Sequence, residues 1–509
     1  MAVFLFGLVF LVAGYFLYGA FVEKVLAPDG RATPCMANPD GVDRIPLPKW
    51  KNMLIQLLNI AGVGPVIGVI SGIKFGKIAL LIIPVGCILL GAVHDFAGGM
   101  MSIRSNGANL PKMIRENLGR WYSSVFSWVM LVLLLLVVAV FINVPANLID
   151  RTVFPDVSFF WWAVALIFIY YIVATVFPVD KIIGSLYPFF GALLVIGSFA
   201  MFVALAVEAF KSPEIFGESA AFLDFRQNVF NKDGRSPIFP LLFVTIACGI
   251  ISGFHATQSP IVARTMRSER EARVTFYGMM VAEGIIAMIW AAAGLAMYNL
   301  SPENLKLAPA VVLGNITLKF LGPWMGGVTV FAIVILAITS GDTALRSARL
   351  SLSEMIGVDQ RPLLCRFAVC APLIVAVSLL LWWSNSSAKS FGHLWNYFAW
   401  GNQMISASTL MAASVWLLRG GRGVKALIVL LPGMFMVSVV ATFILWTSAD
   451  RGGPWGIVPG GLSLGISTAI SIVAAVLFAI FVFRRAGIRL LGKNKTLLSQ
   501  GFDGGGKRS

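Results

Sequence analysis

Long apolar runs dominate the chain, and their positions predict a bundle of membrane helices. A helix needs about 20 predominantly apolar residues to cross a bilayer, and thirteen segments of the sequence meet that requirement. The prediction is therefore an all-α polytopic membrane protein with about 13 transmembrane helices. The predicted spans are 2–22, 52–72, 76–102, 122–149, 159–178, 183–209, 238–258, 274–298, 324–346, 365–384, 391–418, 424–447 and 462–484.

Two of these runs are interrupted by small and polar residues, at 59–72 and at 243–267. Irregular backbone persists at membrane depth only where it lines a cavity or is buried in protein. We therefore expect two discontinuous helices whose breaks face one polar substrate site, although the second run could also simply end near Ser252. The predicted substrate-binding residues are Asn59, Gly62, Gly64, Gly249, Ser252, Gly253 and His255. A leucine at Gly64 or Gly253 is expected to fill that cavity without disturbing a core.

The two interrupted runs each open a group of five predicted spans. Because five is odd, the second group enters the membrane from the opposite side, which is the condition for a 5+5 inverted repeat. The segment 301–322 is predicted to hold a further short helix. The predicted organisation is a leader helix and cytoplasmic loop (1–51), repeat one (52–209), an external loop (210–237), repeat two (238–418), two follower helices (419–491) and a disordered cytoplasmic tail (492–509).

Composition and charge agree with a membrane protein. The chain is 58% hydrophobic and only 12% charged, whereas soluble domains carry about 25% charged residues. Of the 39 Lys and Arg residues, 28 fall on one side of the predicted topology and 11 on the other. The positive-inside rule then places the N-terminus outside and the C-terminus in the cytoplasm. The net charge of +16 follows from this bias and from attraction to anionic membrane lipid, so no nucleic-acid partner is expected.

The sequence gives no support for an enzyme or for a bound cofactor. It contains no phosphate-binding loop, nucleophile elbow or zinc-type Cys/His spacing. The first twenty residues lack the basic start of a signal peptide, so we expect a retained helix there. The expected partners are a small-molecule substrate and lipid, and the oligomeric state is left open.

Three acidic residues, Asp95, Glu283 and Asp342, fall well inside predicted spans and away from their last residues. Ionisable groups in a membrane are costly and point to function. His94 beside Asp95 suggests a pair that handles a proton near neutral pH, while the alternative is a structural pair that pins two helices. Glu283 stands among apolar neighbours, which favours a helix–helix hydrogen bond.

Asp342 lies on one helix face with Thr339, and Ser340 and Thr343 add further hydroxyls. These oxygens suit a small hard cation, so a sodium ion at Thr339 and Ser340 is a second hypothesis for coupling. The alternative is an ion pair between Asp342 and Arg346, four residues further along the helix. Ion coupling is thus assigned either to His94 and Asp95 or to Thr339, Ser340 and Asp342, with a proton or sodium as the ion.

Several motifs resemble the carbon starvation protein family of bacterial membrane transporters. They are NIAGVGPVIG, GAVHDF, RSNGANLPKMIRENLG, TIACGIISGFH and TSGDTALRSAR, and they cover about residues 25–355. The resemblance implies uptake of peptides or pyruvate across the bacterial cytoplasmic (inner) membrane, with proton coupling in the pyruvate carriers. It also implies the 5+5 core of the amino acid–polyamine–organocation superfamily, in which hydroxyls matching Thr339 and Ser340 hold sodium with carbonyls of the first broken helix.

The chain also departs from that family. It is shorter than the long peptide-uptake members, and residues 56–59 replace a His-rich entry to the first break. The resulting hypothesis is a secondary active transporter that imports a small carboxylate-bearing nutrient, a pyruvate-like acid or a short peptide, coupled to a cation gradient. The alternatives are a membrane nutrient sensor and a channel.

Overall fold

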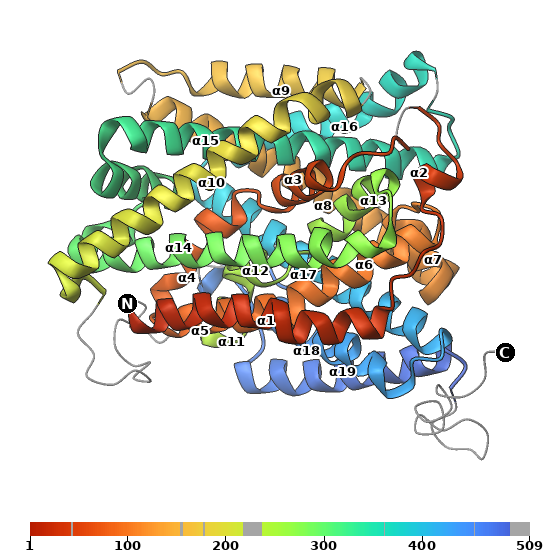
Figure 1. The fold of residues 1–509 in the computed structure, drawn as a ribbon. Coiled ribbons are helices and arrows are strands. Elements are labelled where there is room, and N and C mark those ends of the chain that lie inside the picture. The colour runs from red at the N-terminus through yellow and green to blue at the C-terminus, as the bar shows by residue number, and fades with distance from the viewer. Residues whose placement is uncertain are drawn as a thin grey trace.

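In a computed structural model the protein is a bundle of helices that lie roughly parallel to one another (Figure 1). The structure describes residues 1–41, 44–152, 156–176, 179–216, 237–360, 362–451 and 454–488. Within these ranges the regular structure is helical, apart from an isolated bridge between Leu47 and Met266. The predicted tail and most of the predicted 210–237 loop lie outside the described residues.

The long helices of the first half precede residue 217. They are α1 (Ala2–Leu26), α3 (Lys49–Ile60), α5 (Ile78–Gly86), α6 (Ala92–Arg104), α7 (Leu110–Leu118), α8 (Arg120–Thr152), α9 (Phe160–Val176) and α10 (Val179–Lys211). The second half contains α11 (Ile238–Thr245), α12 (Ala247–Ile250), α13 (Gly253–Thr265), α14 (Gly278–Leu300), α15 (Pro309–Ile356), α16 (Leu363–Ser384), α17 (Ala388–Arg419), α18 (Leu427–Trp446) and α19 (Leu464–Arg485).

Nine helices in the described ranges are long and apolar enough to cross a membrane, or ten if one bent pair forms a single span. The predicted count of thirteen therefore stays a prediction. Three of the predicted spans are not among the helices that are long and apolar enough to cross a membrane, each for its own reason. Helix α9 has only 17 residues, the 238–258 run is divided among short helices, and α17 buries polar residues such as Asn402 and Gln403.

Both predicted helix breaks are present. Helix α3 ends at Ile60, and the chain resumes at Gly64 with a π-helical turn (Gly64–Gly68) that leads into α4 (Val69–Gly72), at a bend of 52°. In the second run, Ile251 and Ser252 adopt extended backbone between α12 and α13. The polar interruptions in the sequence thus mark real lapses of helical structure.

Helix α15 is bent at a glycine rather than continuous. Gly322 has φ of 70°, a left-handed conformation that glycine adopts without a Cβ clash, and Pro323 follows it. The segment before this bend is helical, as predicted for residues 301–322, and the segment after it carries Ser340 and Asp342. The same element therefore supplies a short helix before the bend and a long helix after it.

One end of the bundle is closed by the connection between α1 and α3. The backbone of Leu47 donates a hydrogen bond to Thr265, at 3.0 Å, and Cys35 donates to the carbonyl of Met266.

Arg104 bonds to Glu269 at 3.0 Å, and the side chain of Glu269 is fully buried. The guanidinium of Arg31 beside Asp29 lowers the pKa of that carboxyl. These contacts fasten the connection across the end of α13.

Candidate functional site

The two breaks pack directly against each other, and glycines make this approach possible. A Cβ added at Gly64 would lie 2.2 Å from the Cβ of Cys248, and one at Gly249 would lie 3.0 Å from Val69 Cγ1. A Cβ at Gly253 would lie 2.2 Å from the carbonyl oxygen of Asn402. These glycines are therefore close-packing positions. The expectation that a leucine at Gly64 or Gly253 would fill only empty space is wrong.

Asn402 of α17 fixes the second break. Its Oδ1 accepts a hydrogen bond of 2.7 Å from the backbone N–H of Phe254, and its Nδ2 donates to Ser252 Oγ at 2.9 Å. An N–H group at the start of α13 and the side chain of Ser252 at the break therefore share one side-chain partner. Sequence reasoning did not single out Asn402, although an Asn-Gln pair within an apolar run was the available signal.

A buried chain of ionisable groups joins three helices next to the breaks. His94 Nδ1 lies 2.8 Å from Asp95 Oδ1, and Asp95 Oδ2 lies 2.9 Å from His255 Nδ1. His255 Nε2 lies 3.6 Å from Glu283 Oε2. All four side chains have 0% exposure. We call this set the carboxylate–imidazole chain; it consists of His94 and Asp95 on α6, His255 on α13 and Glu283 on α14.

The carboxylate–imidazole chain has the chemistry of a proton-binding site. Carboxylates and imidazoles exchange protons near neutral pH, and buried charges require partners. Within the described part of the protein, neither oxygen of Glu283 has a hydrogen-bond partner, and the Nε2 atoms of His94 and His255 also lack one. A separation of 3.6 Å is too long for a hydrogen bond. Glu283 therefore faces His255 without the helix–helix hydrogen bond that the sequence favoured.

Two buried amides lie at the end of α3. Gln56 and Asn59 are 0% exposed, and none of their amide atoms has a hydrogen-bond partner among the described residues. They share a helix face with Asn52, which accepts a 2.7 Å bond from Thr265 of α13. Buried polar groups are normally paired with protein or water. These amides thus offer donors and acceptors along the α3–α13 contact.

The hydroxyls of α15 form a separate polar site. Ser340 Oγ donates to the carbonyl of Leu58 in α3 at 3.2 Å, which joins the two groups that the sodium hypothesis requires. Neither oxygen of the buried Asp342 has a hydrogen-bond partner among the described residues. Arg346 donates to the carbonyl of Ala174 in α9. Asp342 and the carboxylate–imidazole chain thus belong to different helix contacts.

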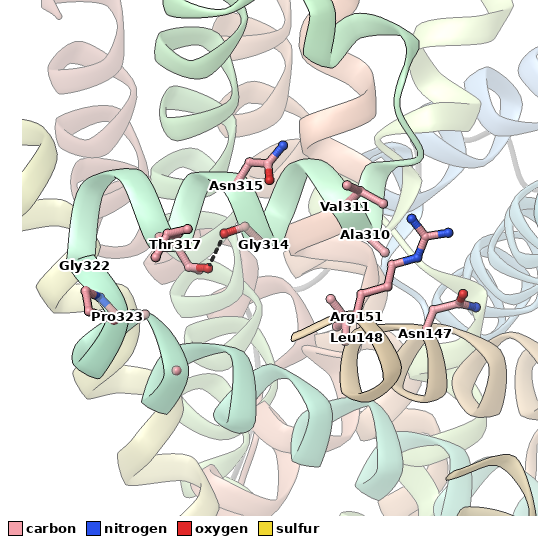
Figure 2. Close-up of a pocket in the computed structure, with 13 residues that line it drawn as sticks. Asn147, Leu148, Arg151, Ala310, Val311, Gly314, Asn315, Thr317, Gly322 and Pro323 are labelled. Carbon is pink, nitrogen blue, oxygen red and sulfur yellow. Dashed lines mark hydrogen bonds between the residues drawn. The ribbon is translucent and has the colours of Figure 1, made fainter. Parts of the chain in front are cut away.

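A cavity of about 520 Å³, which we call the central cavity, lies near the breaks and extends to the end of the bundle where α8 ends. The described residues that line it include none of the predicted substrate-binding residues. Ile67 follows the first break and Thr245 precedes the second, and both line it. A cavity of about 360 Å³, which we call the side cavity, adjoins it (Figure 2). The residues that line both are Asn147, Arg151, Ala310 and Val311.

Relatives identified by sequence are membrane proteins and transporters. An uncharacterized membrane protein of Haemophilus influenzae is 42% identical over 60% of this chain and 92% of its own length. The peptide transporter CstA of Campylobacter jejuni is 24% identical over 91% of this chain and 81% of its own. The pyruvate/proton symporter BtsT of Escherichia coli is 27% identical over 55% of this chain and 47% of its own.

Solved structures with a similar fold are also transporters. A variant of the manganese transporter of Eremococcus coleocola superposes with a TM-score of 0.52 at 14% identity, over 88% of this chain and 99% of that one. A Na⁺-coupled sialic acid symporter gives a TM-score of 0.51 at 14% identity, over 96% and 99%. At such identities the likeness concerns the fold alone.

The family match extends over most of the sequence. The model of the carbon starvation protein CstA family matches residues 1–165, 156–319 and 304–443. These segments include both helix breaks and the whole carboxylate–imidazole chain. The protein belongs to the carbon starvation protein CstA family.

Proposed function

We propose that the protein is a secondary active transporter that imports a small carboxylate-bearing nutrient, a pyruvate-like acid or a short peptide, by alternating access. One observation carries the proposal: two broken helices pack against each other, close to a cavity and to a buried carboxylate–imidazole chain. Discontinuous helices of this kind hold substrate and coupling ions in transporters. The names of two relatives, a peptide transporter and a pyruvate/proton symporter, support the substrate class.

The substrate site in this proposal lies at the helix breaks, next to the described lining of the central cavity. Helix α3 ends at Ile60, and extended backbone separates α12 from α13. Backbone groups at helix ends of this kind can bind a ligand. The residues proposed to form or shape this site are Asn59, Gly62, Gly64, Gly249, Ser252, Gly253 and His255. The buried amide of Asn59 and the backbone near the breaks supply polar groups, while the glycines permit the close packing.

Coupling in this proposal uses a proton. Asp95 and His255 belong to different helices, so a movement of α13 relative to α6 separates their charges. Separated buried charges are costly, whereas a protonated carboxylate or a neutral imidazole is less so. Proton binding and helix movement are therefore linked. The pyruvate/proton coupling in the name of BtsT is consistent with this choice.

A sodium ion at the α3–α15 contact is a second candidate for coupling. It is supported by the 3.2 Å contact between Ser340 Oγ and the Leu58 carbonyl and by the unpaired oxygens of Asp342. Carbonyl, hydroxyl and carboxylate oxygens are suitable ligands for a hard cation. Thr339 would supply a further hydroxyl one residue away.

Gradient-driven uptake tests the proposal. Purified protein in liposomes is given radiolabelled pyruvate or alanyl-alanine, with an imposed proton or sodium gradient. The expected result is accumulation under the proton gradient, lost in Asp95→Asn and kept in the matched surface variant Asp450→Asn, whose side chain is exposed. Exchange of internal for external substrate should survive in Asp95→Asn, because exchange need not release the proton. Gradient-independent flux would favour a channel, and absence of transport a sensor.

A further inference from the structure

Arg151 lines both the central cavity and the side cavity. Among the described residues that line the central and side cavities, Arg151 is the only charged one. It lies in the last turn of α8 and is exposed. Figure 2 shows its side chain beside Asn147 and facing the segment that carries Ala310 and Val311. A charged molecule in either cavity is therefore close to the positive charge of the Arg151 guanidinium.

Glycines form part of the wall of the side cavity, and there is free space beside two of them. A Cβ added at Gly314 or Gly327 would have no neighbouring atom within 4 Å. The polar lining includes Asn147, whose Nδ2 donates to the Asn143 carbonyl at 2.9 Å and so leaves Oδ1 as an acceptor. Asn315 donates to Asn304 at 2.7 Å. The cavity thus combines free volume, one guanidinium and amide groups.

We propose that the side cavity, with Arg151, is a capture site for organic carboxylates that supplies the central cavity. A guanidinium binds a carboxylate through two parallel hydrogen bonds. A lone positive charge at the mouth of a low-dielectric cleft also raises the local concentration of anions. Because Ala310 and Val311 line both cavities, a captured carboxylate has a short path to the central cavity.

This inference rests on the proposed function, because it assigns a route to the substrate of that transporter. The competing explanation is that Arg151 only stabilises the C-terminal end of α8 through the helix dipole. The two explanations differ in their effect on kinetics. A capture site changes the substrate concentration at half-maximal uptake, whereas a helix-end contact changes stability alone.

Uptake kinetics in proteoliposomes test the capture site, with radiolabelled pyruvate and alanyl-alanine as probes. Arg151→Gln should raise KM about tenfold with the maximal rate nearly unchanged, and Arg151→Lys should recover part of the loss as a point charge. Added salt should raise KM in the natural protein and have little effect in Arg151→Gln. Lys319→Gln is the matched control, because Lys319 is an exposed cation of α15 that lines neither cavity.

A second variant separates volume from charge. Gly314 lines the side cavity and not the central cavity, so Gly314→Leu reduces the volume of the side cavity and should also raise KM. Unchanged KM in both Arg151→Gln and Gly314→Leu would overturn the inference, as would a loss confined to the maximal rate. A change in Arg151→Gln that followed the anionic lipid content of the liposomes and not the substrate would assign Arg151 to lipid instead.

Failure of the proposed function would give a different result. In that case neither probe would accumulate in the natural protein under any gradient, and calorimetric titration of the detergent-solubilised protein with pyruvate and alanyl-alanine would then test capture by itself. Binding weakened by Arg151→Gln would support the site. Binding unaffected by that substitution, or no binding of either probe, would overturn it.

Discussion

At the residue scale, Glu283 is the group whose importance the sequence understated. His255 is separated from Asp95 by 160 residues in sequence, yet their side chains lie 2.9 Å apart. Glu283 then extends the contact to a third helix. The sequence identified His94, Asp95 and His255 as polar or ionisable residues that are costly to bury in a membrane. The periodicity of one helix, however, does not indicate which distant helix will pack against that helix. That these residues form one carboxylate–imidazole chain could be recognised only from the three-dimensional structure.

Glu283→Gln tests the end of the carboxylate–imidazole chain. The amide keeps the shape of the side chain but cannot take up a proton, so proton-driven accumulation should fall at least tenfold while substrate exchange persists. Paired measurements of accumulation and exchange in proteoliposomes check this, with Asp450→Asn as the control. Undiminished accumulation in Glu283→Gln would remove Glu283 from the coupling mechanism.

Ser340→Ala distinguishes the two candidate ion sites. The substitution removes the hydrogen bond to the Leu58 carbonyl, a loss of about 0.5–1.5 kcal/mol in stability. Under proton coupling, accumulation driven by a proton gradient should remain within about twofold of normal in Ser340→Ala, since the carboxylate–imidazole chain is intact. Uptake that required sodium and was lost in both Ser340→Ala and Asp342→Asn would instead place the coupling ion at the α3–α15 contact.

At the element scale, the helix breaks were predictable because small and polar residues interrupt otherwise apolar runs. Their packing was not predictable, because a glycine that opens a cavity and a glycine that admits a neighbouring helix look the same in sequence. Gly64 and Gly253 are of the second kind. The bend of α15 at Gly322 shows the same limit, since Gly-Pro signals a bend but not its direction.

Leucine at Gly64 or Gly253 should destabilise the protein. Its Cβ would meet Cys248 or the Asn402 backbone at 2.2 Å, and such overpacking typically costs about 1–3 kcal/mol or more. The thermal unfolding temperature of the detergent-solubilised protein should therefore fall in both variants. Gly327→Leu is the matched control, because a Cβ there meets no atom within 4 Å. Equal unfolding temperatures in all three variants would contradict the packing described for the breaks.

At the scale of the whole molecule, composition and hydropathy were sufficient to predict a polytopic helical membrane protein. The number of spans was less well determined. Polar residues that serve the core, such as those of α17, lower the apolar character on which a count depends. The two cavities and the position of Arg151 in the lining of both could not be predicted, since the cavity walls combine α8, α15 and other distant segments.

The predicted topology can be measured by labelling of introduced cysteines in intact cells. The distribution of basic residues predicts that a thiol at Lys306 is reached from outside and that one at Arg270 is not. Both positions are exposed on the protein surface, so access depends on the side of the membrane. Labelling of Arg270→Cys but not Lys306→Cys from outside would reverse the orientation and the direction of the proposed import.

In the proposed mechanism the movement of a carboxylate is linked to the movement of a proton. The most direct test of this link is the internal pH of proteoliposomes, reported by an entrapped dye, after pyruvate or alanyl-alanine is added outside without an imposed gradient. We expect the lumen to become acidic, to do so only when both substrate and protein are present, and to remain unchanged in pH with Asp95→Asn. Substrate entry with no change in internal pH would contradict this link.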